Sequence, residues 1–249
     1  MHKKLEYREE PSKEVAARYF QGDSNAQDSN QPAIRIRRGV YRFAHHFFVK
    51  VAHPRISPVQ KGRNMLFAQQ ATRIPVATVY ALLHDEESGL EILIQEYIPG
   101  EDLEAFWKRL DQQGKDAMLA TPRGYFDDLR RIPSRGYFGS PWRQPTIQPF
   151  VFSQVCGPGV DDHGPCQYEE QWIELMIRAA IREHPLSEVR IEFERILLHS
   201  VLLGHPRPVF THGDFGWDHV RVRSDGVVFL KDWKSSGGIR LTGNSVFAP

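Results

Sequence analysis

The spacing of hydrophobic and polar residues changes at the sequence Ile98-Pro99-Gly100. Before it, residues 33–43 alternate for a few positions, 47–51 form a short β-rich run, and 76–83 and 90–97 have the pattern of further strands. Helical spacing of apolar residues occurs there over 62–71. This part of the chain is therefore predicted to be a mostly antiparallel sheet with one inserted helix.

Helices are predicted to dominate after Gly100. Four stretches have apolar residues at helical spacing: 103–110, 117–132, 169–184 and 186–203. Residues 133–168 are rich in proline, glycine and aromatic side chains, which predicts a long excursion without regular structure. A loop of that length in a compact domain is usually functional or poorly ordered. Short strands are predicted again over 209–233, around a Ser-Asp-Gly turn.

The predicted organisation has three parts. Residues 1–32 form an N-terminal extension, with a possible short helix over 1–20 and a polar, flexible connector over 21–32. Residues 33–100 form a sheet-rich N-lobe that ends in a hinge, and residues 101–249 form a helical C-lobe.

Composition and charge place the chain among globular proteins. Hydrophobic residues make up 41% and charged residues 25%, so wholesale disorder is not expected. The net charge of +1 gives no global attraction to nucleic acid or to an anionic membrane. The N-terminal sequence has no apolar signal region, and no apolar run approaches the roughly 18 residues of a spanning helix. We therefore expect a cytoplasmic protein whose partners include neither nucleic acid nor membrane.

Two cysteines, Cys156 and Cys166, enclose a short loop. They could form a disulfide, bind a metal together with Asp162 and His163, or be two unrelated thiols in an irregular segment. The third alternative is favoured, because a cytoplasmic compartment keeps thiols reduced and no further cysteine or closely spaced histidine completes a zinc site.

Candidate chemistry is concentrated near the end of the chain. Residues 220–223 and 227–231 flank an Asp-Gly turn, which predicts a hairpin. A hairpin brings its open ends together, so His219 should lie beside Asp232, and the loop that carries Asp214 enters at the same end. Asp218 adjoins this cluster. Two carboxylates with a polar group between them could position a hydroxyl and hold Mg²⁺, which prefers one or two carboxylates plus phosphate oxygens.

These residues resemble a known family. His212-Gly213-Asp214, the polar residue 219 and Asp232-Trp233 after the hairpin are similar to the catalytic and metal-binding segments of the aminoglycoside phosphotransferase and choline kinase-like family. Further segments resemble the family in the same order along the chain: 47–50, 63–67, 73–76, 96–100 and, as in its fungal branch, 131–134 and 136–139. The resemblance implies an α+β, two-lobed protein-kinase-like fold, with an antiparallel N-lobe sheet, one N-lobe helix and a mainly helical, incomplete C-lobe.

The resemblance also implies an activity, which is the ATP-dependent transfer of a phosphoryl group to a small-molecule hydroxyl. The cofactors would be ATP and Mg²⁺, and the partners a nucleotide and an acceptor that the sequence does not identify. The resemblance implies that Asp214 accepts the proton and that Asp232 binds the metal together with Asp218 or His219. It implies that Lys50 binds the phosphates and that the backbone of Glu96, Tyr97 and Ile98 binds adenine. His212 and Gly213 would support the catalytic loop.

Four departures from the family pattern favour a second hypothesis. His219 replaces an asparagine, and imidazole suits softer metals than Mg²⁺. Lys61 stands where a helix glutamate would orient Lys50, and Lys234 stands where a glutamate usually follows Asp-Trp. The last stretch, 238–249, has no helical pattern where the family continues. The alternative is therefore a catalytically impaired pseudokinase, or a truncated relative, that binds a nucleotide or a partner without turnover.

Overall fold

The computed structural model describes residues 34–43, 46–53, 57–133, 135–144, 165–183, 187–202 and 208–239. The chain forms two compact units, the first within residues 1–62 and 77–98 and the second within residues 63–76 and 99–249. The predicted N-terminal extension, 1–32, lies outside the described residues. Within the described ranges, no helix is long and apolar enough to cross a membrane.

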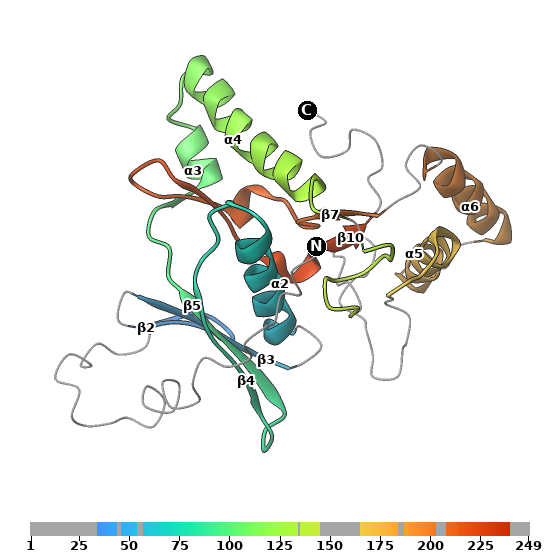
Figure 1. Cartoon of the computed structure of the whole chain (residues 1–249), viewed down its shortest axis with the longest axis horizontal. Helices are drawn as coiled ribbons and strands as arrows, with labels where there is room; N and C mark the ends of the chain where they lie inside the picture. The colour runs from blue at the N-terminus through green and yellow to red at the C-terminus, as the bar shows by residue number, and fades with distance from the viewer. Residues whose placement is uncertain are drawn as a thin grey trace, which may run out of the picture. The chain divides into compact units, whose positions relative to one another are not determined.

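The first unit is built on a five-stranded antiparallel sheet with the order β1-β2-β3-β5-β4 (Figure 1). Val49, Ala81 and Ile94 form its buried centre, with aromatic and aliphatic side chains of neighbouring strands packed around them. The predicted antiparallel sheet is confirmed. Its strands are β1 (Ile34–Arg37), β2 (Val40–Phe43), β3 (Phe47–Ala52), β4 (Val79–Asp85) and β5 (Leu90–Glu96).

The inserted helix is α2 (Pro58–Ala71), which starts four residues before the predicted range. The hydroxyl of Ser57 accepts a hydrogen bond from the Gln60 N–H at 3.1 Å, and the Glu91 carboxylate accepts one from the Val59 N–H at 3.2 Å. These bonds satisfy N–H groups that have no partner inside the helix. The proline in the first helical position is also favourable there.

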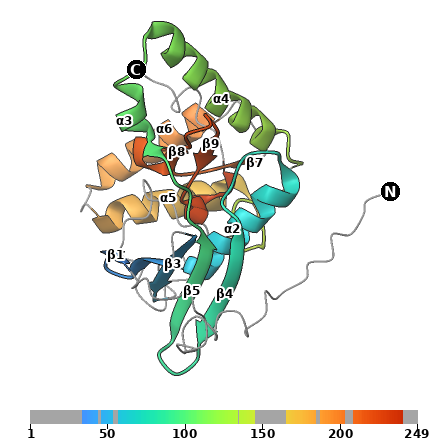
Figure 2. The ribbon, with the colours of Figure 1, turned by 90° about the vertical axis from the view of Figure 1, so that its left-hand side faces the viewer.

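The second unit combines helices with short strands (Figure 1, Figure 2). Two small sheets have the orders β6-β8-β9 and β10-β7, and α5 and α6 lie side by side (Figure 2). The elements are β6 (Glu101–Asp102), α3 (Leu103–Trp107), α4 (Gln112–Arg130), α5 (Glu169–Glu183), α6 (Glu188–Leu202), β7 (Val209–Thr211), η1 (Trp217–His219), β8 (Val220–Val222), β9 (Val228–Leu230), η2 (Trp233–Ser235) and β10 (Gly237–Ile239).

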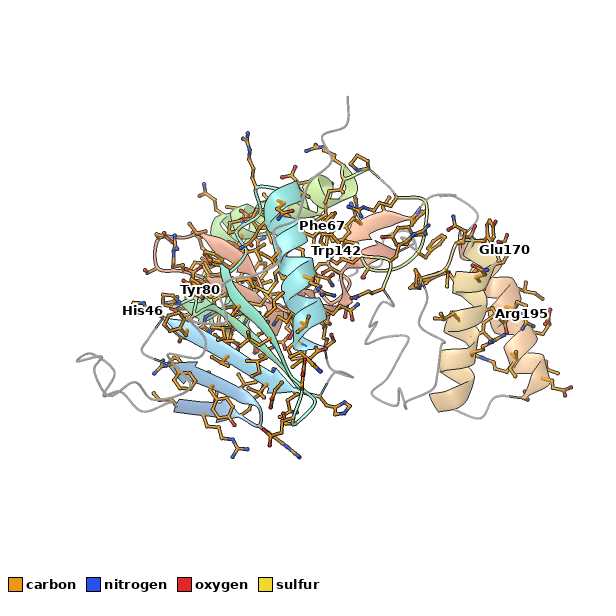
Figure 3. The ribbon with its side chains drawn as sticks, turned by 60° about the horizontal axis from the view of Figure 1, so that its bottom comes forward. His46, Phe67, Tyr80, Trp142, Glu170 and Arg195 are labelled. Atoms are coloured by element: carbon orange, nitrogen blue, oxygen red, sulfur yellow. The ribbon has the colours of Figure 1, made fainter. Side chains whose placement is uncertain are left out.

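An aromatic group forms part of the core of this unit. The ring of Phe67, on α2, lies 4.9 Å from the ring of Phe210 on β7 and 6.3 Å from that of Trp142 (Figure 3). The guanidinium of Arg135 lies 5.5 Å from the Phe67 ring, in a cation–π arrangement. These contacts hold the C-terminal part of α2 against the strand that leads into the His212 loop.

The structure also corrects the bounds of two helices after Gly100 and adds two short strands. Helix α4 begins at Gln112, five residues before the predicted start, because the Asp111 carboxylate accepts a hydrogen bond from the Gly114 N–H at 2.8 Å and caps the helix. Helix α3 ends at Trp107, three residues before its predicted end. Strands β6 and β10 were not predicted; β6 pairs antiparallel with β8, and β10 with β7.

The predicted irregular excursion, 133–168, is described only at its two ends. Phe138 forms an isolated antiparallel bridge with Cys166, and Gly139 forms one with Gly238. The Cys166 thiol is buried, and burial raises its pKa. The disulfide and metal alternatives also involve Cys156, Asp162 and His163, which lie outside the described residues.

Candidate active site

The loop that carries Asp214 connects β7 to the hairpin of β8 and β9. In that hairpin Val220 pairs with Leu230, and the Lys231 N–H donates to the His219 carbonyl at 2.7 Å. The open end of the predicted hairpin therefore places His219 opposite Lys231, one residue before Asp232. Because this pairing is local in sequence, the Asp-Gly turn was sufficient to predict it.

His212 is completely buried and ties this loop to the segment after Asp232. Its Nε2–H donates to the Lys231 carbonyl at 2.7 Å, and its ring packs edge-on against Trp233 with centroids 4.8 Å apart. The Ser236 hydroxyl donates to the His212 carbonyl at 3.2 Å. These contacts fix the backbone on both sides of the Asp214 carboxylate.

Gly213 allows the same loop to approach η2 closely. Its φ is +77°, and a Cβ added there would lie 2.2 Å from the Ser235 carbonyl oxygen. Any side chain would therefore push the loop away from η2. Glycine satisfies both the backbone conformation and the close approach.

Asn64, which the sequence analysis did not single out, also holds η2. Its side chain is completely buried on α2, and its Nδ2 donates to the carbonyls of Trp233 at 2.8 Å, Ser236 at 3.3 Å and Lys234 at 3.4 Å. The sequence shows it only as a polar residue of a predicted helix, within the segment 63–67 that resembles the family. Its partners are far away in the chain, so the sequence could not reveal them.

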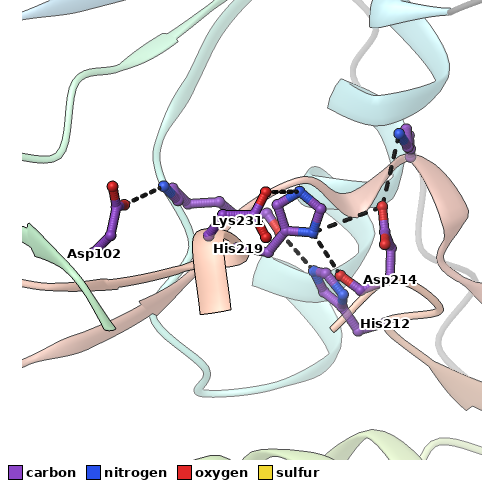
Figure 4. A network of polar contacts seen from close by, with 7 residues as sticks. Asp102, His212, Asp214, His219 and Lys231 are labelled. Carbon is purple, nitrogen blue, oxygen red and sulfur yellow. Dashed lines mark hydrogen bonds and ion pairs between the residues drawn. The ribbon is translucent and has the colours of Figure 1, made fainter. Parts of the chain in front are cut away.

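The Asp214 carboxylate is almost buried, and basic groups lie on two sides of it. Its Oδ2 is 3.7 Å from His219 Nδ1 (Figure 4). The same oxygen is 3.7 Å from Lys234 Nζ. Burial raises the pKa of Asp214 above its usual value. His219 and Lys234 oppose that shift, whereas the carboxylates of Asp232 and Asp218 add to it. Asp214 is thus a carboxylate whose proton affinity is increased by its surroundings.

His219 is oriented by the loop itself. Its Nδ1 lies 2.8 Å from the Asp214 backbone carbonyl, which can only accept, so Nδ1 carries the hydrogen. The other ring nitrogen, Nε2, faces the Asp218 carboxylate at 3.3 Å. The Asp218 side chain is 81% exposed. His219 therefore lies between the backbone of the Asp214 loop and a carboxylate at the surface.

Asp232 has the left-handed backbone conformation, with φ +61° and ψ +59°, and it is buried. Its charge contributes to the raised pKa of Asp214, so the two carboxylates are electrostatic neighbours. Within the described part of the chain, no three histidine, cysteine or acidic side chains are already arranged around a common metal position. Mg²⁺ usually takes one or two carboxylates and completes its coordination with phosphate oxygens and water, so a metal role for Asp232 stays a prediction.

A second ionic cluster lies beside the hairpin and was also missed. Asp102 Oδ1 accepts a hydrogen bond from Lys231 Nζ at 2.8 Å (Figure 4). It accepts a second one from Arg221 Nη1 at 3.1 Å. Burial acts to raise the pKa of Asp102, but the two basic side chains outweigh it and lower the pKa below its usual value. Asp102 lies opposite Arg221 in the β6–β8 pair. This pairing is distant in sequence and has no local motif.

The other predicted site residues belong to the first unit. Lys50 lies on β3, opposite Val40 of β2 and Leu93 of β5. The Glu96 carboxylate accepts hydrogen bonds from the N–H and hydroxyl of Thr78, both at 3.0 Å.

The structure also describes the predicted hinge and Lys61, which stands where the family pattern has a helix glutamate. The Tyr97 N–H donates to the His46 carbonyl at 2.7 Å. Ile98 is buried, and so is Lys61 on α2.

Solved structures resemble this arrangement over most of the chain. A protein assigned as a fructosamine-3-kinase from Haemophilus somnus aligns with a TM-score of 0.59 and 15% identity, over 88% of this chain and 72% of the other. Aminoglycoside phosphotransferase APH(4)-Ia aligns with a TM-score of 0.54 and 13% identity, over 90% and 72%. The chain has the fold of the aminoglycoside phosphotransferases. APH(2″)-IIa aligns likewise, with a TM-score of 0.52 and 16% identity, over 89% and 71%.

The aminoglycoside phosphotransferase fold confirms the predicted α+β, protein-kinase-like fold class. Searches with the sequence give no match to a family model and no significant match to a curated protein. At identities of 10–16% the likeness to these structures establishes the fold only, and the activity has to be argued from the chemistry of the site.

Proposed function

We propose that the chain is an ATP-dependent phosphotransferase that acts on a hydroxyl group of a small molecule. The observation that carries this proposal is the buried Asp214 carboxylate, flanked by His219 and Lys234, on the loop after β7. Two proteins of the same fold support it. APH(2″)-IIa has been solved with streptomycin and ATP, and a thermostable variant of APH(4)-Ia with AMP-PNP and hygromycin B.

In this proposal Asp214 accepts the proton of the acceptor hydroxyl. A general base is most effective when its pKa approaches the working pH, and burial shifts the pKa of Asp214 in that direction. His212 and Gly213 keep the loop in place through their contacts with Lys231 and Ser235. Phosphoryl transfer depends mainly on positioning and charge neutralisation, so a rigid base is the main requirement.

The remaining roles are part of the same proposal. Lys50 binds the phosphates, and the backbone of Glu96, Tyr97 and Ile98 binds adenine. Mg²⁺, when bound, neutralises phosphate charge; Asp232 would hold it, together with Asp218 or His219. A cytoplasmic location and the absence of nucleic-acid and membrane partners stay predictions.

The test is an assay of acceptor-dependent ADP release, with a panel of aminoglycosides, choline and sugars. We expect turnover with at least one acceptor, reduced about 10²–10⁴-fold by Asp214→Asn, the typical contribution of a general base. Asp225→Asn is the matched control, because Asp225 is an exposed carboxylate in the hairpin turn. Equal activity of the Asp214 variant and wild type would contradict the proposed role of Asp214.

Two observations favour a second candidate, a catalytically impaired relative. Lys61 is a buried cation at the position where the family has its helix glutamate, and His219 Nδ1 is engaged by the Asp214 backbone. Under this alternative, combining Lys61→Glu with His219→Asn increases turnover from an undetectable level. Phosphotransfer by the wild-type chain that is abolished by Asp214→Ala would exclude it.

A further inference from the structure

Lys234 is directed at the catalytic carboxylate. It lies on η2, two residues after Asp232, and its Nζ is 3.7 Å from Asp214 Oδ2. The lysine side chain is 30% exposed and the carboxylate only 12%. The lysine is therefore the more solvent-accessible side chain of the pair, and an incoming anion could contact it.

The backbone that carries this lysine is fixed from two sides. Asn64 donates to the carbonyls of Trp233, Lys234 and Ser236. Gly213 packs directly against the Ser235 carbonyl. Lys234 thus extends from a backbone held in place by α2 and by the catalytic loop itself. This preorganisation reduces the entropy lost when the side chain binds a ligand.

The geometry of phosphoryl transfer places the transferred group near this ammonium. The acceptor oxygen must lie within about 3 Å of Asp214 to give up its proton. The phosphorus that it attacks lies about 3–3.5 Å from the same oxygen. In the transfer the new O–P bond forms, the bond from the γ-phosphorus to ADP breaks with its electron pair leaving on ADP, and the proton passes to Asp214. The equatorial phosphoryl oxygens carry the charge.

We propose that Lys234 binds the γ-phosphoryl group of ATP and donates a hydrogen bond to one of its non-bridging oxygens during transfer. The inference rests on the proposed function and adds to it a catalytic residue outside the family pattern. In that pattern a glutamate follows Asp-Trp, so Lys234 replaces a negative charge with a positive one. The same chain has His219 in place of the expected asparagine, so the ammonium adds positive charge where an oxygen ligand is lost.

The test compares ATP with ADP, because only ATP carries the γ-phosphoryl group. Binding of each nucleotide in MgCl₂ is measured by calorimetry for wild type, Lys234→Met, Lys234→Arg and Lys108→Met. Lys108 is an exposed lysine, paired with Glu104 on α3, and serves as the control. Thermal melts establish that each variant is folded.

We expect Lys234→Met to weaken ATP binding about tenfold or more, the loss of one charge-assisted hydrogen bond, and to leave ADP binding within about twofold of wild type. Lys234→Arg should retain part of the preference for ATP, and it serves as the test variant if Lys234→Met does not fold. Lys108→Met should match wild type for both nucleotides.

Three results would overturn the inference. Unchanged ATP binding in Lys234→Met would show that the lysine does not contact the γ-phosphoryl group. An equal loss of affinity for ATP and ADP would assign the lysine a structural role. Tighter ATP binding by Lys234→Met would show that its ion pair with Asp214 opposes nucleotide binding. If the folded wild-type protein binds neither ATP nor ADP, the proposed function itself is wrong, and the inference about Lys234 is wrong with it.

Discussion

At the scale of single residues, Asn64 has the largest number of backbone partners in the site. Its amide donates to three carbonyls of the segment 233–236, and none of its own surface is exposed. Buried carbonyls that lose a donor cost free energy, because water cannot replace it. The stability of η2 and the position of Lys234 therefore depend on one side chain from a different part of the sequence.

Replacing Asn64 by leucine should lower the free energy of unfolding by about 1–3 kcal/mol, the cost of leaving buried polar groups unsatisfied. Asn64→Asp should cost more, because it directs carboxylate oxygens at three carbonyl oxygens. Urea unfolding measures both changes. Gln112→Leu, at an exposed position on α4, is the control, and equal stability of Asn64→Leu and wild type would contradict the prediction.

Asp214 should lower the stability of the folded state at neutral pH. Its folded pKa is raised, so its stabilising contribution is fully present below the unfolded pKa and is lost as the pH rises through the folded pKa. Asp214→Asn should therefore raise Tm at pH 7, by roughly 2–4 °C for each kcal/mol regained. The difference should disappear in acid, below the unfolded pKa. A lower Tm of the variant at pH 7 would contradict this sign.

At the scale of elements, the loop that carries Asp214 is coupled to η2 by the close approach of Gly213 to Ser235. Gly213 and Gly226 both have positive φ, at +77° and +82°, but only at Gly213 would a Cβ meet neighbouring backbone. Both alanine variants incur the left-handed penalty of roughly 1–2 kcal/mol. Gly213→Ala should lower the free energy of unfolding in urea clearly more than Gly226→Ala does, and the difference measures the energy of the loop contact. An equal decrease in both variants would contradict this, because the loop would then move away from η2 without a cost in free energy.

Helices α5 and α6 are linked by an ion pair between Arg195 Nη2 and Glu174 Oε2 at 3.1 Å. The hydrogen bond from Arg195 lowers the pKa of Glu174, against the opposing effect of burial. A depressed folded pKa stabilises the protein above the unfolded pKa, and that contribution is lost as the pH falls through the folded pKa.

Because both side chains are more than one-third exposed, Arg195→Met should cost less than about 1 kcal/mol at low salt. The cost should shrink in 1 M NaCl and again in acid, where Glu174 is protonated. Urea unfolding under these conditions checks this, with Arg131→Met as the control for an exposed pair within one element. If the free-energy cost of Arg195→Met did not depend on salt, the side chain would stabilise the helix pair through packing and not through its charge.

The sequence predicted elements well where their signals are local. The β8–β9 hairpin follows from its Asp-Gly turn, and the β4–β5 pair from two apolar runs around a polar turn. Element ends were less accurate, because the Ser57 and Asp111 caps extend α2 and α4 beyond their apolar residues. Strand β10 was missed because two of its three residues are glycine, which has low strand propensity.

The same distinction applies to the candidate site. His212, Asp214, His219 and Asp232 are close in sequence, and a motif identified them. The Asn64 and Asp102 contacts join positions more than one hundred residues apart in sequence, so no pattern near either residue reveals them. The roles of Lys50, Glu96, Tyr97 and Ile98, and the resemblance to fungal members of the family, stay predictions.

At the scale of the whole molecule, nucleotide binding should appear as a gain in stability. A ligand that binds only the folded state stabilises it by about 2.7 kcal/mol at a hundredfold excess over its Kd. We expect ATP with Mg²⁺ to raise Tm, and ATP without Mg²⁺ to raise it less. Thermal melts check this, with adenosine as the control that lacks phosphates. A cooperative melt that ATP does not shift would contradict nucleotide binding.

The β7–β10 ladder sets a limit on shortened versions of this protein. Thr211 pairs with Gly237 and Val209 with Ile239, so the two strands enclose the whole sequence from His212 to Ser236. A fragment that stopped before Gly237 would keep every proposed catalytic side chain of the second unit but lose the strand that closes their loop. The smallest fragment able to keep this part of the site in shape should therefore extend through Ile239.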